Sequence, residues 1–192
     1  MGTTTPTIDW RPLTGERWDD LERLFGPKGA VGGCWCMLWR CPRKTFDADK
    51  GEGNRRAMNA LVEGGQVPGI LVYRGGDPAG WCSVAPRAAF PALARSRILK
   101  PVDDEPVWSI SCLFVPRALR GAGVADDLIA AALAHAGARG AEIVEAYPVE
   151  PATGSMPAVF AWTGFAQSFT RAGFVEVARR SPTRPIMRRA VA

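Results

Sequence analysis

Apolar and polar positions recur along the chain with two different periods, and these periods predict strands and helices. Two short runs rich in β-branched and aromatic residues flank the polar turn 74–78, a spacing typical of a β-hairpin. From 124 to 136 the apolar residues recur every three to four positions, which indicates a helix with one buried face. The core elements expected, in chain order, are a hairpin (69–73 and 79–84), a strand (108–115), a helix (124–136), a strand (141–147), an irregular segment that becomes helical (158–172) and a last hairpin (174–179 and 185–189).

The first 68 residues have a different pattern, with more predicted helix and more aromatic residues. A short strand (7–11) precedes a helix at about 14–25, and a second helix (55–63) ends at two glycines, a frequent stop signal. A short irregular helix is expected at 88–96. We therefore expect one α+β domain over 1–192, in which helices flank a mixed, mostly antiparallel central sheet with one parallel crossover. Residues 1–68 would form the N-terminal strand and helices, and 69–192 the sheet core.

Composition limits the class of protein. Hydrophobic residues make up 47% of the 192 residues, which excludes a disordered chain. No apolar run reaches the roughly eighteen residues of a membrane span, so no membrane partner is expected. The N-terminus lacks the basic and apolar segments of a secretory signal, and the five cysteines are an odd number, which favours free thiols. These features favour a cytoplasmic protein.

The charge balance favours anionic ligands. The formal net charge is +5, and arginines are concentrated near the C-terminus. A basic protein attracts anions over long range. Because no basic face interleaved with aromatic residues accompanies these arginines, we expect them to be solvated strand and turn residues and expect no nucleic-acid partner.

The segment 113–125, LFVPRALRGAGVA, carries the most specific chemistry. An apolar strand ends at Pro116, a short basic turn containing Gly121 and Gly123 follows, and then a helix begins. The first turn of a helix leaves backbone N–H groups unpaired, and the helix dipole adds positive charge there. Glycines let a ligand approach the backbone closely. This arrangement predicts an anion site, most often one for phosphate.

Two common phosphate motifs do not fit this segment. The pattern GxxxxGK[ST] is absent, and GxGxxG is incomplete because Asp126 stands where its last glycine would be, so neither a P-loop nor a dinucleotide site is expected. The residues RGAGVA at 120–125 instead fit [RQ]xxGx[GA], and the segment resembles the GNAT N-acetyltransferase superfamily. The stretch SFTRAGFVEV at 168–177 is similar to the late helix, Gly-Phe turn and strand of that family. The order of elements also agrees from about 70 to the C-terminus.

The resemblance implies a GNAT-like acyl-CoA N-acyltransferase fold with acetyl-coenzyme A as co-substrate. The pyrophosphate would lie on backbone N–H groups of 121–125, and the pantetheine arm would pair with 113–115 like an additional strand. A backbone N–H near Leu113 or Phe114 would polarise the acetyl carbonyl. The cofactor-binding residues expected on this basis are Leu113, Phe114, Val115, Arg117, Arg120, Gly121, Ala122, Gly123, Val124 and Ala125.

Proton transfer is less well specified. In many members of the family a tyrosine four residues before the glycine of the Gly-Phe turn protonates the leaving thiolate, and here Phe169 occupies that position. We expect Tyr147 to take this part as a residue of the pocket. Glu145 lies two positions earlier on the same strand face and could act as the general base. The alternatives are a buried Tyr147 ring with a satisfied hydroxyl and a structural Glu145 carboxylate.

The segment 32–41, GGCWCMLWRC, is dense in aromatic residues and sulfur. Its cysteines, Cys34, Cys36 and Cys41, lack the spacing and the nearby histidine of a zinc site, so no metal is expected. A covalent acyl relay through one of these thiols would need a histidine base that the sequence does not place nearby. We therefore favour packing of this segment over the acceptor side of the sheet.

The same segment supplies candidate walls for the acceptor. In the family that it resembles, the region between the first helices commonly lines the acceptor site. Trp35, Trp39 and Trp81 are therefore the expected substrate-binding residues, suited to an acceptor of apolar or cationic character.

The leading interpretation is an N-acetyltransferase that transfers acetyl directly from acetyl-coenzyme A to an amine of a small molecule or protein. One alternative is a catalytically impaired coenzyme A-binding regulatory module, because Phe169 replaces the usual tyrosine. Another is an RNA-directed acetylating toxin, suggested by the basic charge alone. The acceptor is not specified, since a fold does not fix a substrate, and a homodimer is possible.

Overall fold

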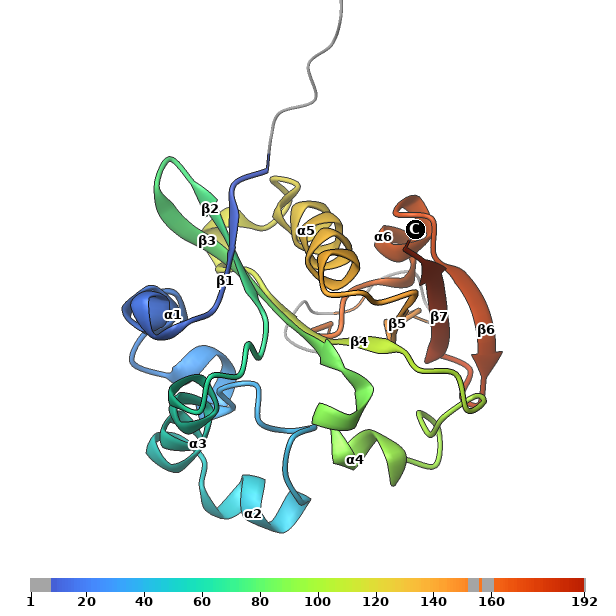
Figure 1. The fold of residues 1–192 in the computed structure, drawn as a ribbon, viewed down its shortest axis with the longest axis horizontal. Coiled ribbons are helices and arrows are strands. Elements are labelled where there is room, and N and C mark those ends of the chain that lie inside the picture. Colours follow the sequence, from blue (N-terminus) through green and yellow to red (C-terminus); the bar gives the residue numbers. More distant parts are fainter. Residues whose placement is uncertain (1–7, 152–155, 157–160, 192) are drawn as a thin grey trace, which may run out of the picture.

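The computed structural model describes residues 8–151, 156 and 161–191. Within them, seven strands form one sheet in the order β1-β2-β3-β4-β5-β7-β6 (Figure 1). Neighbouring strands are antiparallel except β4 and β5, which are parallel. The strands are β1 (Trp10–Pro12), β2 (Ile70–Arg74), β3 (Asp77–Pro86), β4 (Trp108–Phe114), β5 (Ile143–Ala146), β6 (Val175–Arg179) and β7 (Pro185–Ala190). The mixed α+β architecture with one parallel crossover is confirmed.

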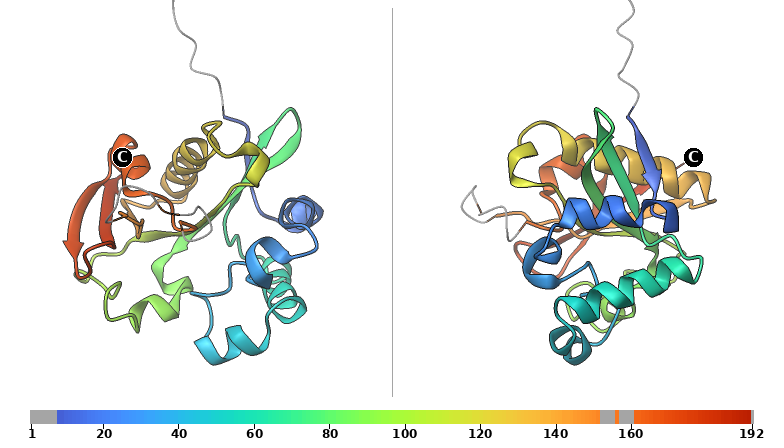
Figure 2. Two further views of the ribbon diagram at one scale, coloured as in Figure 1. Left: turned by 180° about the vertical axis from the view of Figure 1, so that it is seen from behind. Right: turned by 90° about the vertical axis from the view of Figure 1, so that its left-hand side faces the viewer.

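Helices cover both faces of this sheet (Figures 1 and 2). They are α1 (Trp18–Phe25), α2 (Arg43–Ala48), α3 (Glu52–Glu63), α4 (Pro91–Ala94), α5 (Val124–Ala138) and α6 (Ala166–Arg171). Helices α5 and α6 lie on one face, and α1 to α4 lie on the other. Helix α2 was not expected from the sequence, because its six residues carry a single buried apolar side chain, Phe46. No helix among the described residues is long and apolar enough to cross a membrane.

The packing of α5 fixes the position of the anion loop that precedes it. Its apolar stripe, which includes Leu128 and Ile129, is fully buried against the sheet, and each such side chain contributes about 1.5–3 kcal/mol of transfer free energy. Gly80 on β3 allows a close approach, since a Cβ there would lie 2.8 Å from Val124 Cγ1 and 3.0 Å from Leu128 Cδ1. The N-terminus of α5 is therefore held directly beside the central strands.

The sheet opens between its two parallel strands. Strand β4 pairs with β5 only through 108–110, whereas it stays paired with β3 as far as Phe114. Residues 111–114 therefore have no partner strand on the β5 side within the described part of the chain. At this free edge the Leu113 N–H donates a hydrogen bond to the Trp162 carbonyl, with an N···O distance of 2.7 Å. The opening exposes the end of β4 next to the start of α5.

Candidate functional site

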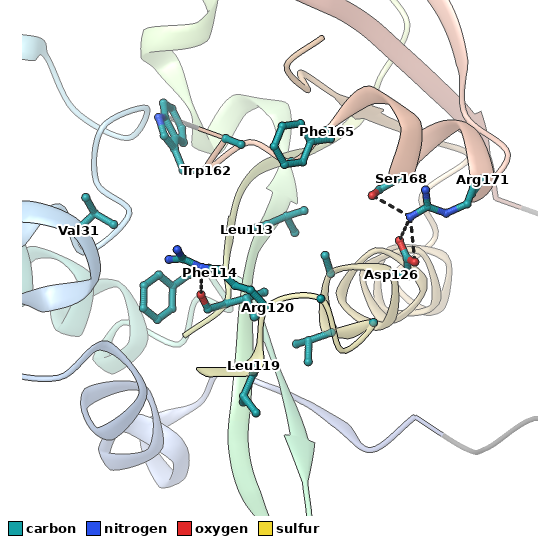
Figure 3. A pocket seen from close by; sticks show the side chains of 17 residues that line it. Val31, Leu113, Phe114, Leu119, Arg120, Asp126, Trp162, Phe165, Ser168 and Arg171 are labelled. Carbon is teal, nitrogen blue, oxygen red and sulfur yellow. Dashed lines mark hydrogen bonds and ion pairs between the residues drawn. The ribbon is translucent and has the colours of Figure 1, made fainter. Parts of the chain in front are cut away.

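A groove of about 450 Å³ lies at the end of β4, where the sheet opens (Figure 3). The β4 residues Leu113 and Phe114 form its floor, and the loop into α5 forms one wall. The opposite wall comes from 161–165 and α6. Three segments far apart in the sequence therefore meet at this groove.

The loop wall of the groove presents unpaired backbone N–H groups. Gly121 and Gly123 have φ angles of +80° and +81°, a left-handed conformation that favours glycine, and Gly123 is the N-cap of α5. Among the described residues, no acceptor is paired with the N–H of Gly121, Gly123, Val124 or Ala125. With the positive end of the α5 dipole, these donors form a cradle for an anion.

Side chains around the loop keep its shape. Arg120 Nε donates to the Val115 carbonyl at 3.2 Å, so this side chain folds back onto the loop. At the mouth of the groove, Arg171 Nη2 lies 2.9 Å and 3.0 Å from the two carboxylate oxygens of Asp126 (Figure 3). Arg171 therefore compensates the only acidic side chain among the described residues that line the groove.

Most of the expected cofactor-binding residues line this groove: Leu113, Phe114, Val115, Arg120, Gly121, Gly123, Val124 and Ala125. Arg117 is exposed outside its lining, and Ala122 donates its N–H to the Leu119 carbonyl at 3.4 Å. The N–H of Leu113, one of the two expected to polarise a carbonyl, is occupied by Trp162 in this structure.

A second cavity of about 260 Å³, here called the acceptor pocket, adjoins the groove. Four residues line both spaces, so the two meet at the end of β4: Val31, Leu113, Phe114 and Trp162. The other described residues that line the pocket are Ala30, Cys34, Cys36, Leu38, Trp39, Phe46 and Cys112. None of these side chains carries a formal charge at neutral pH.

Only one of the three expected tryptophan walls lines the acceptor pocket. Trp39 does, whereas Trp35 stacks on Trp18 with ring centroids 5.9 Å apart. Trp81 is fully buried, and its Nε1 donates to Cys36 Sγ at 3.2 Å. Trp35 and Trp81 therefore pack behind the pocket. Trp162 is a wall that the sequence did not indicate, because it comes from a segment without periodic pattern.

The thiols near the pocket are held in their protonated form. Cys36 Sγ lies 3.4 Å from Cys112 Sγ, and this contact, with burial, raises the pKa of the Cys36 thiol well above its usual range. The hydrogen bond with Cys36, together with burial, also raises the pKa of Cys34. A neutral thiol is a weak nucleophile, so a covalent relay gains no support. No group of three or more potential metal ligands is present among the described residues.

Tyr147 and Glu145 are close to each other, as their shared strand face predicts, but they face α4 and not the groove. The Tyr147 hydroxyl donates to Glu145 Oε1 at 2.7 Å and lies 2.7 Å from Ser109 Oγ. The Glu145 carboxylate forms ion pairs with Arg87 at 2.5 Å and Arg188 at 2.8 Å. Burial raises the pKa of Tyr147 well above its usual range.

Neither of these two side chains is exposed, and neither lines the groove or the acceptor pocket. This placement matches the structural alternative for both residues. Their catalytic role stays a prediction, and the geometry gives it no support.

Helix α6 turns Ser168 toward the groove, and not Phe169, which holds the sequence position of the family's tyrosine. Phe169 is fully buried and packs edge-on against Phe174, with ring centroids 5.1 Å apart. Ser168 lines the groove instead, and its Oγ accepts a hydrogen bond from Arg171 Nη2 at 3.1 Å. The described lining of the groove therefore contains no tyrosine or histidine that could donate a proton.

Comparisons with known proteins agree with the sequence motif. A model of the acetyltransferase (GNAT) family matches residues 35–165, more than half of the chain. A search of curated proteins found no match.

Among solved structures, that of histone acetyltransferase HPA2 and related acetyltransferase from Corynebacterium glutamicum is 16% identical, with a TM-score of 0.56 and 97% of each chain covered. Arylalkylamine N-acetyltransferase 2 from Aedes aegypti is 13% identical, with a TM-score of 0.55 and coverage of 97% of this chain and 100% of that one. The PaiA N-acetyltransferase from Thermoplasma acidophilum, in complex with coenzyme A, is 10% identical, with a TM-score of 0.53 and coverage of 96% and 99%. These likenesses show a shared fold.

Proposed function

The chain belongs to the acetyltransferase (GNAT) family, and on this premise we propose that it transfers an acetyl group from acetyl-coenzyme A directly to an amine. The observation that carries the proposal is the junction of two spaces at the end of β4. One is a groove with an anion cradle, and the other is an uncharged pocket. A donor bound in the groove would present its thioester to an amine bound in the pocket.

The cradle suits the pyrophosphate of coenzyme A. Four unpaired N–H groups at Gly121, Gly123, Val124 and Ala125 can each donate to a phosphate oxygen, and the helix dipole adds attraction. Arg120 orders this loop by its bond to Val115.

The pantetheine arm would run from the cradle along the free edge of β4. There it would reach the Leu113 N–H, which now donates to Trp162. Displacement of the Trp162 carbonyl would free this donor to polarise the acetyl carbonyl and to stabilise the oxyanion that forms when the amine attacks.

The acceptor pocket itself favours the reactive form of the amine. An ammonium ion loses hydration on entering an uncharged, apolar site, so the pocket lowers the pKa of a bound amine and favours the neutral nucleophile. The nitrogen then attacks the carbonyl carbon, the tetrahedral intermediate expels the coenzyme A thiolate, and the nitrogen loses a proton to water. Since a thiol has a pKa of about 8.5, its thiolate can leave near neutral pH without a dedicated acid.

Release of the coenzyme A thiol, measured with a chromogenic disulfide over a panel of amines, tests this function. We expect acetyl-coenzyme A turnover that depends on the amine and yields one acetylated amine for each thiol released. Saturable binding of coenzyme A without turnover on any amine would instead support the second candidate, a regulatory coenzyme A-binding module. That candidate is favoured by the burial of Phe169 where the family often has its proton donor. Failure of coenzyme A to bind would reject both.

A further inference from the structure

A third cavity of about 560 Å³ lies beyond the acceptor pocket, and we call it the arginine cavity. It is formed between α4, the start of α2 and the turn that joins β6 and β7. Figures 1 and 2 show α2 and α4 on the same face of the sheet. Its described lining is Leu38, Trp39, Pro42, Arg43, Ala92, Arg95, Ser96, Ile98, Leu99, Trp162 and Arg184. The lining thus combines an apolar surface with three arginines and no acidic side chain.

Two of these arginines have no carboxylate partner in the part of the chain that the structure describes. Arg43 forms an ion pair with Asp47 at 2.6 Å, but neither Arg95 nor Arg184 forms one within the described residues. The positions outside the described residues contain no aspartate or glutamate, so no acidic side chain there can supply the missing charge.

Arg184 is the more informative of the two because it is only partly exposed. Its Nη1 donates to Thr163 Oγ1 at 2.9 Å and to the Tyr147 carbonyl at 3.4 Å, and burial lowers its pKa below the usual value. Partial burial of a cation without a counter-charge costs free energy. A bound anion would recover that cost.

The arginine cavity and the acceptor pocket share one aromatic wall. Leu38, Trp39 and Trp162 line both spaces, and the two indole rings lie 6.1 Å apart with an interplanar angle of 36°. Trp39 Nε1 is buried and has no hydrogen-bond partner among the described residues.

We propose that the acceptor amine carries an anionic group, a carboxylate or a phosphate, which binds Arg95 and Arg184 in the arginine cavity while the amine lies in the acceptor pocket. This proposal rests on the proposed acetyl transfer. A ligand atom contacts a ring carbon at about 3.5–4 Å, so two groups on either side of the shared wall are about 7–8 Å apart. The amine and the anion should therefore be separated by at least this distance, along an apolar linker that follows the indole rings.

Matched acceptors of increasing length test the proposal. The series 4-aminobutyrate, 6-aminohexanoate and 8-aminooctanoate would be compared with alkylamines of equal length and with the corresponding aminoalkyl phosphates. We expect kcat/KM for the two longer anionic amines to exceed that of their alkylamine partners by at least about tenfold, the usual effect of a charge-assisted hydrogen bond. The short carboxylate should show no such advantage. Preference for the phosphates over the carboxylates would identify the anion as phosphate, and equal rates for charged and uncharged amines of every length would overturn the proposal.

Variants of the two arginines test whether a preference for anionic amines arises from the arginine cavity. Arg95→Gln and Arg184→Gln should each reduce the ratio of kcat/KM for 8-aminooctanoate to that for octylamine. Arg184→Lys, which keeps the charge, should restore part of it. Arg97→Gln is the matched control, because Arg97 is an exposed arginine near Arg95 that does not line the cavity. An equal loss in the control would contradict the assignment. The ratio is insensitive to a general loss of folded protein.

Direct binding separates the failure of this inference from the failure of the proposed function. Calorimetric titration with 8-acetamidooctanoate needs no catalysis. If no amine is acetylated but this product binds and the Arg184→Gln variant does not bind it, the anion site stands and acetyl transfer fails. If amines are acetylated but neither rate nor binding depends on the anion, acetyl transfer stands and the anion site fails.

Discussion

Replacement of Gly123 by aspartate should weaken the binding of acetyl-coenzyme A by placing a negative charge in the anion cradle. A Cβ at Gly123 meets no atom within 4 Å except Arg74 Nη2 at 3.9 Å, so the first side-chain carbon causes no steric clash. It would lie beside the N–H groups that we assign to the pyrophosphate. A loss of affinity for acetyl-coenzyme A would therefore measure the effect of the added charge, once a control variant accounts for backbone strain.

The size of the effect follows from the distance between the charges. Two unit charges about 4 Å apart repel by about 1 kcal/mol in bulk water and by about 4 kcal/mol at the effective dielectric of a protein surface. The pyrophosphate carries two such charges, and Arg74 offsets part of the new one. We expect the dissociation constant to rise at least about tenfold, since about 1.4 kcal/mol corresponds to a factor of ten.

Gly123→Asn is the matched control, because asparagine has the size and left-handed tolerance of aspartate without its charge. Gly140→Asp is a second control, since Gly140 has a φ of +80° and open surroundings near the other end of α5. Affinity would be measured by calorimetry at low and high salt, and the difference between the aspartate and asparagine variants should shrink in 1 M salt, where the Debye length is about 3 Å. Equal affinities for the two Gly123 variants at low salt would refute the cradle.

Two further predictions concern buried groups away from the groove. His135 packs between Trp10 and Trp108, and burial lowers its pKa from 6.5 to about 4. The unfolded chain therefore binds a proton that the folded one does not as pH falls from 6.5 to 4, and stability should fall by up to about 3 kcal/mol across this window. Urea unfolding at pH 7, 5.5 and 4.5 measures this loss of stability. His135→Phe should remove the part of the pH dependence that His135 causes. An unchanged dependence of the unfolding free energy on pH in this variant would contradict the role of His135. Tyr147→Phe should lower the free energy of unfolding by about 1–3 kcal/mol, because Glu145 loses a hydrogen bond in a buried site, while the pH profile of kcat keeps its shape. A shifted profile with unchanged stability would instead support Tyr147 as the proton donor.

The absence of a tyrosine from the groove lining affects the expected pH dependence of transfer. Without a tyrosine or histidine in the described lining, the rate should follow the ionisation of the amine more than that of the enzyme. Ser168 is the hydroxyl that α6 turns toward the groove, and Arg171 already donates to it. This arrangement suits binding of the donor more than proton transfer.

The sequence by itself determined most of the core elements and the anion loop. Hydrophobic periodicity placed the central strand, α5 and both hairpins within a few residues, because each period is a local property of the chain. Gly121 and Gly123 identified the loop for the same reason, since their backbone conformation and their place before a helix are local. The pairing of Tyr147 with Glu145 was also predictable, because side chains two positions apart lie on one strand face.

Only the tertiary structure decided which surface each of these groups faces. The face that bears Tyr147 and Glu145 turns toward α4 and two arginines instead of the groove, and this depends on strand order and on long-range contacts. Trp162 reaches the end of β4 from a segment without periodic pattern, and it lines both the acceptor pocket and the arginine cavity. Arg95 and Arg184 are 89 positions apart in the sequence and converge only through the fold. Local patterns carry no information on such distances, because packing between elements, not the conformation of any one segment, brings these side chains together.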